Sequence, residues 1–123
     1  MSSIATVYTN DPTKPSLVLV HGLGSAGSIW KSLIPDLIKD FTVYAVDLPG
    51  HGDAPLLTEV GLDPNGLAQN IVEMMERDHG VKELHVAGNS LGGWIALEMA
   101  AVAPDRVKSV TALAPAGLWH EGP

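Results

Sequence analysis

The chain has 123 residues, 46% apolar and 17% charged, a balance typical of one globular domain and not of a disordered chain. Fourteen acidic residues against seven Lys and Arg give a net charge of −7, which predicts no nucleic-acid or anionic-membrane partner. The lack of cysteine excludes disulfides and thiolate chemistry. We find neither a secretory leader nor a membrane-spanning run, and therefore expect one cytoplasmic domain over residues 1–123.

Strand-like and helix-like segments alternate along the chain. The strand candidates are short runs rich in Val and Leu, and the helix candidates carry apolar residues at helical spacing. In chain order we predict an edge strand Ile4–Thr9, strand Ser16–His21, helix Ser28–Lys39, strand Thr42–Asp47, helix Pro64–Arg77, strand Leu84–Asn89, helix Ser90–Ala103 and a weaker strand Arg106–Leu113. The alternation predicts an α/β fold of three layers, αβα, with a small, mostly parallel sheet.

The turn between the strand Leu84–Asn89 and the following helix carries a G-x-S-x-G pattern centred on Ser90. A strand that turns sharply into a helix holds such a serine in a strained conformation, and Gly88 and Gly92 provide room for the chain to approach closely. The helix N-terminus favours negative charge there. We therefore predict Ser90 as a nucleophile and the backbone N–H of Leu91 as a donor to a tetrahedral oxyanion.

Two glycine-containing loops follow the preceding strands. After the strand Ser16–His21 the sequence reads His21-Gly22-Leu23-Gly24, and its glycines allow that loop to fold close to Ser90. The backbone N–H of Leu23 is the predicted second oxyanion donor, with His21, Gly22 and Gly24 in support. After the strand Thr42–Asp47 comes Asp47-Leu48-Pro49-Gly50-His51-Gly52.

The three motifs, in this order, resemble those of the α/β-hydrolase family over residues 5–117. The resemblance implies a partial α/β-hydrolase core that cleaves an ester or related carbonyl substrate through an acyl-enzyme on Ser90. On this resemblance, the substrate is a small acyl compound, and cleavage of a carbon–carbon bond instead of an ester remains open. The resemblance implies no metal or organic cofactor. A serine at this position argues against the epoxide and halide chemistry of relatives that use aspartate.

The resemblance leaves the catalytic triad incomplete. The family places its acid and then its histidine after the nucleophile, whereas only His120 follows Ser90 here, with Glu98, Asp105 and Glu121 as the acids. We interpret the chain as the N-terminal part of the core, without the C-terminal strands, the cap, the acid or the base, and inactive alone. In the family's strand order Arg106–Leu113 lies at an exposed sheet edge, which predicts self-association or a missing C-terminal half as partner.

Three other interpretations remain open. In the first, Ser90 serves only as a helix N-cap. On every interpretation, we expect His21 to fix the geometry of its loop and not to act as a base. Residues 22–27 also fit the G-x-G-x-x-G pattern of dinucleotide-binding domains, with Asp47 as the acidic residue twenty positions later. A non-catalytic binding scaffold is the third possibility.

Overall fold

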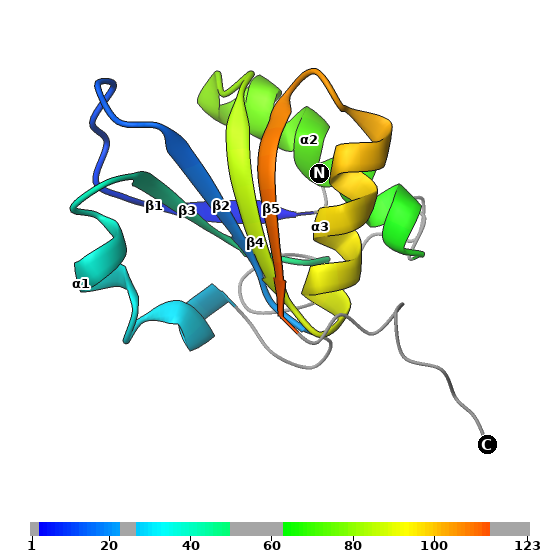
Figure 1. The fold of residues 1–123 in the computed structure, drawn as a ribbon, viewed down its shortest axis with the longest axis horizontal. Helices are drawn as coiled ribbons and strands as arrows, with labels where there is room; N and C mark the ends of the chain where they lie inside the picture. Colours follow the sequence, from blue (N-terminus) through cyan, green and yellow to red (C-terminus); the bar gives the residue numbers. More distant parts are fainter. Residues whose placement is uncertain (1–2, 23–26, 50–62, 114–123) are drawn as a thin grey trace.

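The computed structural model describes residues 3–22, 27–49 and 63–113, which form a five-stranded sheet in the order β1-β3-β2-β4-β5 (Figure 1). The strands are β1 (Ile4–Tyr8), β2 (Ser16–Val20), β3 (Thr42–Asp47), β4 (Leu84–Asn89) and β5 (Val107–Leu113). Only β1 is antiparallel to its neighbour, and the other pairings are parallel. The predicted strands and the mostly parallel sheet are confirmed, and β5 is the last strand of the sheet within the described residues.

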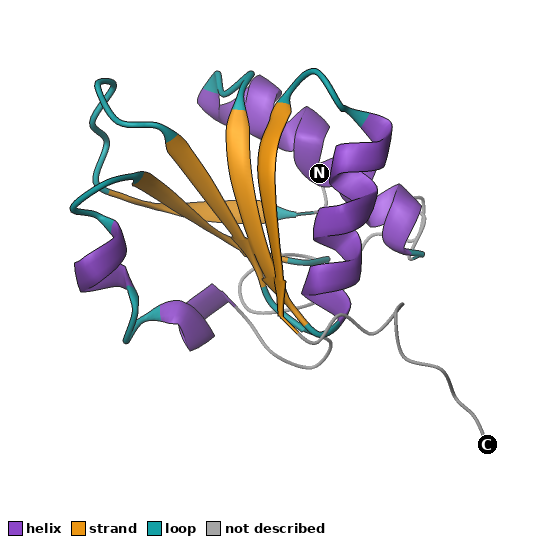
Figure 2. Ribbon diagram, viewed as in Figure 1, coloured by secondary structure: helices purple, strands orange, loops and turns teal. Residues whose placement is uncertain are grey.

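Two long helices cover one face of the sheet. These are α2 (Pro64–His79) and α3 (Leu91–Val102), which pack against each other, and α3 also contacts β4 and β5 (Figure 2). Helix α2 begins at Pro64, as the sequence predicted. The side chain of Asp63 accepts a hydrogen bond from the Gly66 N–H at 2.6 Å, and Pro64 has no N–H that would need a partner in the first turn. No helix within the described ranges is long and apolar enough to cross a membrane.

The helix predicted over Ser28–Lys39 is wrong as a single element. The structure contains a 3₁₀ turn, η1 (Gly27–Trp30), and a one-turn helix, α1 (Ile34–Leu37). Pro35 stands in the first turn of α1, where its missing N–H does no harm. In the interior of a longer helix, its ring would clash with the carbonyl of Lys31, so the helix cannot run through this position.

Alternation along the strands divides the core between the two faces of the sheet. Val18, Val20 and Val86 belong to the larger cluster that faces α2 and α3. Leu17 and Leu19 belong to a smaller cluster with Trp30 on the side of η1 and α1. Among the described residues, this second layer consists of two short helical turns.

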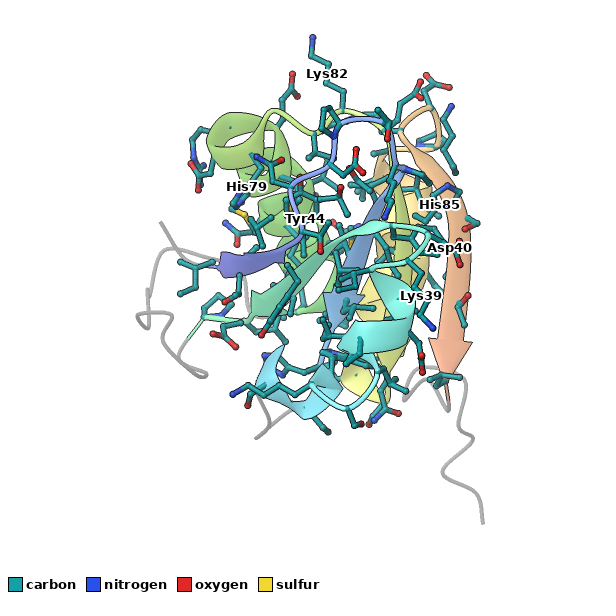
Figure 3. All side chains as sticks on the ribbon, turned by 90° about the vertical axis from the view of Figure 1, so that its left-hand side faces the viewer. Lys39, Asp40, Tyr44, His79, Lys82 and His85 are labelled. Carbon is teal, nitrogen blue, oxygen red and sulfur yellow. The ribbon has the colours of Figure 1, made fainter. Side chains whose placement is uncertain are left out.

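Two histidines outside the predicted site have structural contacts. His79, the last residue of α2, meets the ring of Tyr44 on β3 edge-on at a centroid distance of 5.2 Å (Figure 3). His85 on β4 is hydrogen-bonded through Nδ1 to Ser109 Oγ on β5 at 2.6 Å. These contacts connect α2 with β3 and β4 with β5.

Helix α3 starts unusually close to the carboxyl ends of β2 and β4, and two glycines make this possible. A Cβ atom added to Gly92 would lie 2.1 Å from the carbonyl oxygen of Val20. One added to Gly88 would lie 2.1 Å from the carbonyl oxygen of Gly92. Both neighbours are backbone atoms that cannot move aside, so the approach of helix to sheet depends on these two positions.

Overpacking of a core usually costs about 1–3 kcal/mol. We expect Gly88→Ala and Gly92→Ala each to lower the free energy of unfolding by about 3 kcal/mol or more. Gly80→Ala is the control, since Gly80 has open space around its Cβ position and its cost comes only from its positive φ, 68°. It should cost only about 1 kcal/mol. Urea denaturation measures all three, and equal losses for Gly80 and Gly92 would contradict the close approach.

Candidate active site

Ser90 lies at the turn from β4 into α3 in a backbone conformation that serine rarely adopts. Its φ is 57° and its ψ is −119°, and Thr9 is the only other described non-glycine residue with a positive φ. Such a conformation costs about 1–3 kcal/mol and persists only where the surroundings impose it. Here, the approach of α3 to the sheet imposes it.

The backbone of Ser90 is fixed, while its side chain does not cap the helix. The Ser90 N–H donates to the carbonyl of Leu113 at 2.9 Å, and the Ser90 carbonyl accepts from the Gly93 N–H at 2.9 Å. The side chain makes no capping hydrogen bond, and the residue is exposed. Ser90 therefore occupies the N-cap position of α3, but its side chain does not serve as a cap.

The loop after β2 lies directly beside Ser90. A Cβ atom added to Gly22 would lie 3.4 Å from Ser90 Cβ and 3.9 Å from Ser90 Oγ. The structure thus brings together four of the predicted site residues, Ser90, Gly22, Gly88 and Gly92. Leu23 and Gly24, the remaining predicted residues of this loop, lie outside the described residues.

The start of α3 offers main-chain donors at the same place. Leu91 is the first residue of the helix, and N–H groups in the first turn of a helix have no partner within it. The Gly93 and Trp94 N–H groups both turn back to the Ser90 carbonyl. Among the N–H groups of this turn, the Leu91 N–H is therefore the one that belongs to the residue directly after Ser90.

His21 joins the two loops at this end of the sheet. It is completely buried, its Nδ1 lies 2.6 Å from the Gly22 carbonyl oxygen, and its Nε2 accepts from the Leu48 N–H at 3.0 Å. Because Nε2 accepts, Nδ1 carries the proton and donates to Gly22. Both ring nitrogens are engaged, so His21 positions the loop beside Ser90 and cannot act as its base in this arrangement.

The bond from His21 to Leu48 is the part of the site that the sequence did not predict. A structural role for His21 followed from its place before the glycine loop, but its partner lies 27 residues away on the loop after β3. Nothing in either motif indicates this pairing. It arises because parallel β2 and β3 are adjacent and end at the same edge of the sheet.

The described acids and histidines do not complete a triad at Ser90. Asp105 precedes β5, at the opposite end of the sheet from Ser90, and Glu98 accepts from the Asn65 amide at 3.1 Å. His79 and His85 have the contacts given above. His51, His120 and Glu121 lie outside the described residues. Among the described residues, no group of three or more His, Asp or Glu is arranged to hold a metal ion.

The dinucleotide-binding alternative requires a helix after the glycine loop, with its N-terminus at the pyrophosphate. The structure has only the 3₁₀ turn Gly27–Trp30 there. Asp47, the expected ribose ligand, is buried beside β1, with its Cα opposite Ile4. The geometry therefore favours the elbow at Ser90 over a nucleotide site.

Comparison with known proteins identifies the fold family. A family model described as alpha/beta hydrolase fold matches residues 15–122. The pimeloyl-[acyl-carrier protein] methyl ester esterase of Methylococcus capsulatus is 40% identical over 99 residues, which are 80% of this chain and 36% of that protein. A marine microorganism esterase superposes with a TM-score of 0.77 at 26% identity, over 89% of this chain and 41% of that one.

The N-acyl homoserine lactonase AidH superposes with a TM-score of 0.80 at 27% identity and covers 90% of this chain and 40% of its own. The chain therefore spans about two fifths of the length of the relatives it matches.

Backbone strain at Ser90 predicts opposite consequences for two substitutions. Ser90→Gly removes the Cβ that disfavours a positive φ, whereas Ser90→Ala keeps it. We expect the glycine variant to be more stable than the alanine variant by about 1 kcal/mol, after the greater flexibility of glycine in the unfolded chain is subtracted. Chemical denaturation compares them, and an alanine variant at least as stable as the glycine variant would show that Ser90 is unstrained.

Removal of the His21 side chain should destabilise the whole domain. His21→Ala leaves a cavity and two buried main-chain groups, the Gly22 carbonyl and the Leu48 N–H, without these partners. We expect a loss of about 2–5 kcal/mol in the free energy of unfolding. His85→Ala, at a half-buried position on β4, is the control and should cost less. Similar losses for both would mean that the loop connection contributes little.

Proposed function

This chain belongs to the α/β-hydrolase fold family, and on that premise we propose that Ser90 is the nucleophile of a serine hydrolase that acts on esters or related acyl compounds. The observation that carries the proposal is the strained, exposed position of Ser90 between Gly88 and Gly92, beside the Gly22 loop. A serine that served only to start a helix would need neither the strain nor this neighbourhood.

The proposed reaction has two steps. Ser90 Oγ attacks the substrate carbonyl as a base removes its proton, and the leaving alcohol departs to give an acyl-enzyme. Water then releases the acid and restores Ser90. The Leu91 and Leu23 N–H groups hold the tetrahedral oxyanion in both steps, a contribution for which a single donor is typically worth about 10²–10³ in rate.

We propose that the base and the acid come from polypeptide other than the described residues. A serine hydroxyl is a weak nucleophile without a base. His21 is engaged at both nitrogens, and His79 and His85 pack elsewhere in the fold. On this proposal, the described residues give little or no turnover by themselves.

The proposed substrate is a small molecule with a carboxylic ester bond. Support comes from the names of the relatives, since a methyl ester esterase and a lactonase both act on such bonds, the second within a ring. A backbone oxyanion site needs neither metal nor organic cofactor to stabilise the charge that develops on an ester carbonyl.

A chimera tests the nucleophile. The 99 matched residues of the Methylococcus esterase are replaced by those of this chain, so that the rest of that protein supplies its own C-terminal part. We expect hydrolysis of a p-nitrophenyl ester and a single fluorophosphonate adduct on Ser90. Ser90→Ala should abolish the adduct and lower hydrolysis by a factor on the order of 10⁴ or more.

Ser109→Ala in the same chimera is the control, because Ser109 is exposed like Ser90 but lies on the sheet away from the elbow, hydrogen-bonded to His85. It should keep both the adduct and the activity. A folded chimera whose hydrolysis survives Ser90→Ala would overturn Ser90 as the nucleophile. A folded chimera with neither hydrolysis nor an adduct would favour a non-catalytic scaffold. A Ser90 adduct on the unmodified 123-residue chain would show that a base of this chain reaches the serine.

A further inference from the structure

Gly22 is a glycine that neither the backbone conformation nor the packing of the fold requires. A fold needs glycine where φ is positive or where a Cβ atom has no room. Gly80 is the only glycine of the described residues with a positive φ, and a Cβ atom on Gly88 or Gly92 would lie 2.1 Å from a backbone oxygen. Gly22 meets neither condition.

A small side chain at position 22 has room in the fold. The atoms nearest to an added Cβ would be the Asn89 carbonyl oxygen and Ser90 Cβ, both at 3.4 Å, followed by Ser90 Oγ at 3.9 Å. These separations are close to those of ordinary van der Waals contact, which are about 3.5–4.0 Å between carbon atoms. The fold therefore accepts a methyl group here, in contrast to positions 88 and 92.

That methyl group would nevertheless lie against the proposed nucleophile. Two of its three nearest atoms belong to the side chain of Ser90. When a carbonyl carbon bonds to Ser90 Oγ, the oxygen of the tetrahedral centre turns toward the main-chain donors, and one of these, the Leu23 N–H, belongs to the residue directly after Gly22. The atoms added to Ser90 in the reaction thus need room on the side of the serine that Gly22 borders.

Neither partner of this contact can easily withdraw. Gly22 is buried, and its carbonyl oxygen lies 2.6 Å from His21 Nδ1, while His21 is itself bonded to the Leu48 N–H. The backbone of Ser90 is held by hydrogen bonds to Leu113 and Gly93. A group added between the two therefore crowds the serine side chain instead of moving the loop away.

We propose that Gly22 is a positioning residue for the reaction at Ser90, and that the absence of its side chain serves the nucleophile and not the fold. This inference rests on the proposed function of Ser90. The room beside Ser90 Cβ and Oγ lets the hydroxyl, and then the tetrahedral centre formed on it, take the orientation in which the main-chain donors reach the oxyanion. Such stabilisation depends on donors that are already in place, so crowding at this point is costly.

Gly22→Ala in the chimera with the Methylococcus esterase tests the inference. We expect an unchanged urea midpoint, together with a fall of about tenfold to a hundredfold in kcat and in the rate of fluorophosphonate labelling, as for a small misplacement of reacting groups. KM should change little. The loss should be the same for p-nitrophenyl acetate and p-nitrophenyl butyrate, because the methyl group contacts Ser90 and not the acyl chain.

Two glycine variants are the controls. Gly80→Ala adds the same methyl group in open space, far from the elbow, and should keep both rates. Gly92→Ala should give the opposite pattern to Gly22→Ala, a lower urea midpoint, because its Cβ meets backbone.

Three results would overturn the inference. Gly22→Ala at the full rate would show that the nucleophile tolerates the group, and Gly22→Ala with the low urea midpoint of Gly92→Ala would show that the fold needs the glycine. A loss that grows with acyl length would assign Gly22 to the binding of the acyl chain. A parent chimera without hydrolysis that depends on Ser90 contradicts the proposed nucleophile itself, and this is seen before any change at position 22.

Discussion

The close approach of α3 to the ends of β2 and β4 determines the rest of this structure. Gly88 and Gly92 have backbone atoms where any other residue would carry a side chain, so the helix begins within a single residue of the strand. Ser90 takes up the sharp change of direction and is held at a positive φ. The strain, the exposure of the hydroxyl and the N–H groups of the first helical turn are consequences of one steric constraint.

A second constraint aligns the loops around that turn. His21 is buried at the edge where the parallel strands end, and it connects the main chain after β2 with the main chain after β3. A neutral imidazole with one donor and one acceptor suits this position, because the two loops present a carbonyl and an N–H to it. His21 thus positions the loop that carries a proposed oxyanion donor, and it does not transfer a proton in this arrangement.

The two faces of the sheet differ in how well they are covered. Helices α2 and α3 close one face over a continuous core, whereas Pro35 divides the segment that covers the other into two short turns. Within the described residues, a pocket on this second face is lined by residues of β2, β4 and β5. The carbonyl of Leu113, at the end of β5, also holds the backbone of Ser90. A main-chain hydrogen bond therefore joins the end of β5 to the turn at Ser90.

The sequence alone determined the order of strands and helices, the parallel sheet and the turn at Ser90, because apolar periodicity, helix caps and glycine spacing are local signals. It failed at Ser28–Lys39, where helical apolar spacing concealed the break that Pro35 imposes. Tertiary structure alone decided what lies side by side at the ends of the strands: Gly22 against Ser90, and His21 against Leu48. Those contacts join residues 27 to 68 positions apart, and their geometry follows from strand order, which no short motif encodes.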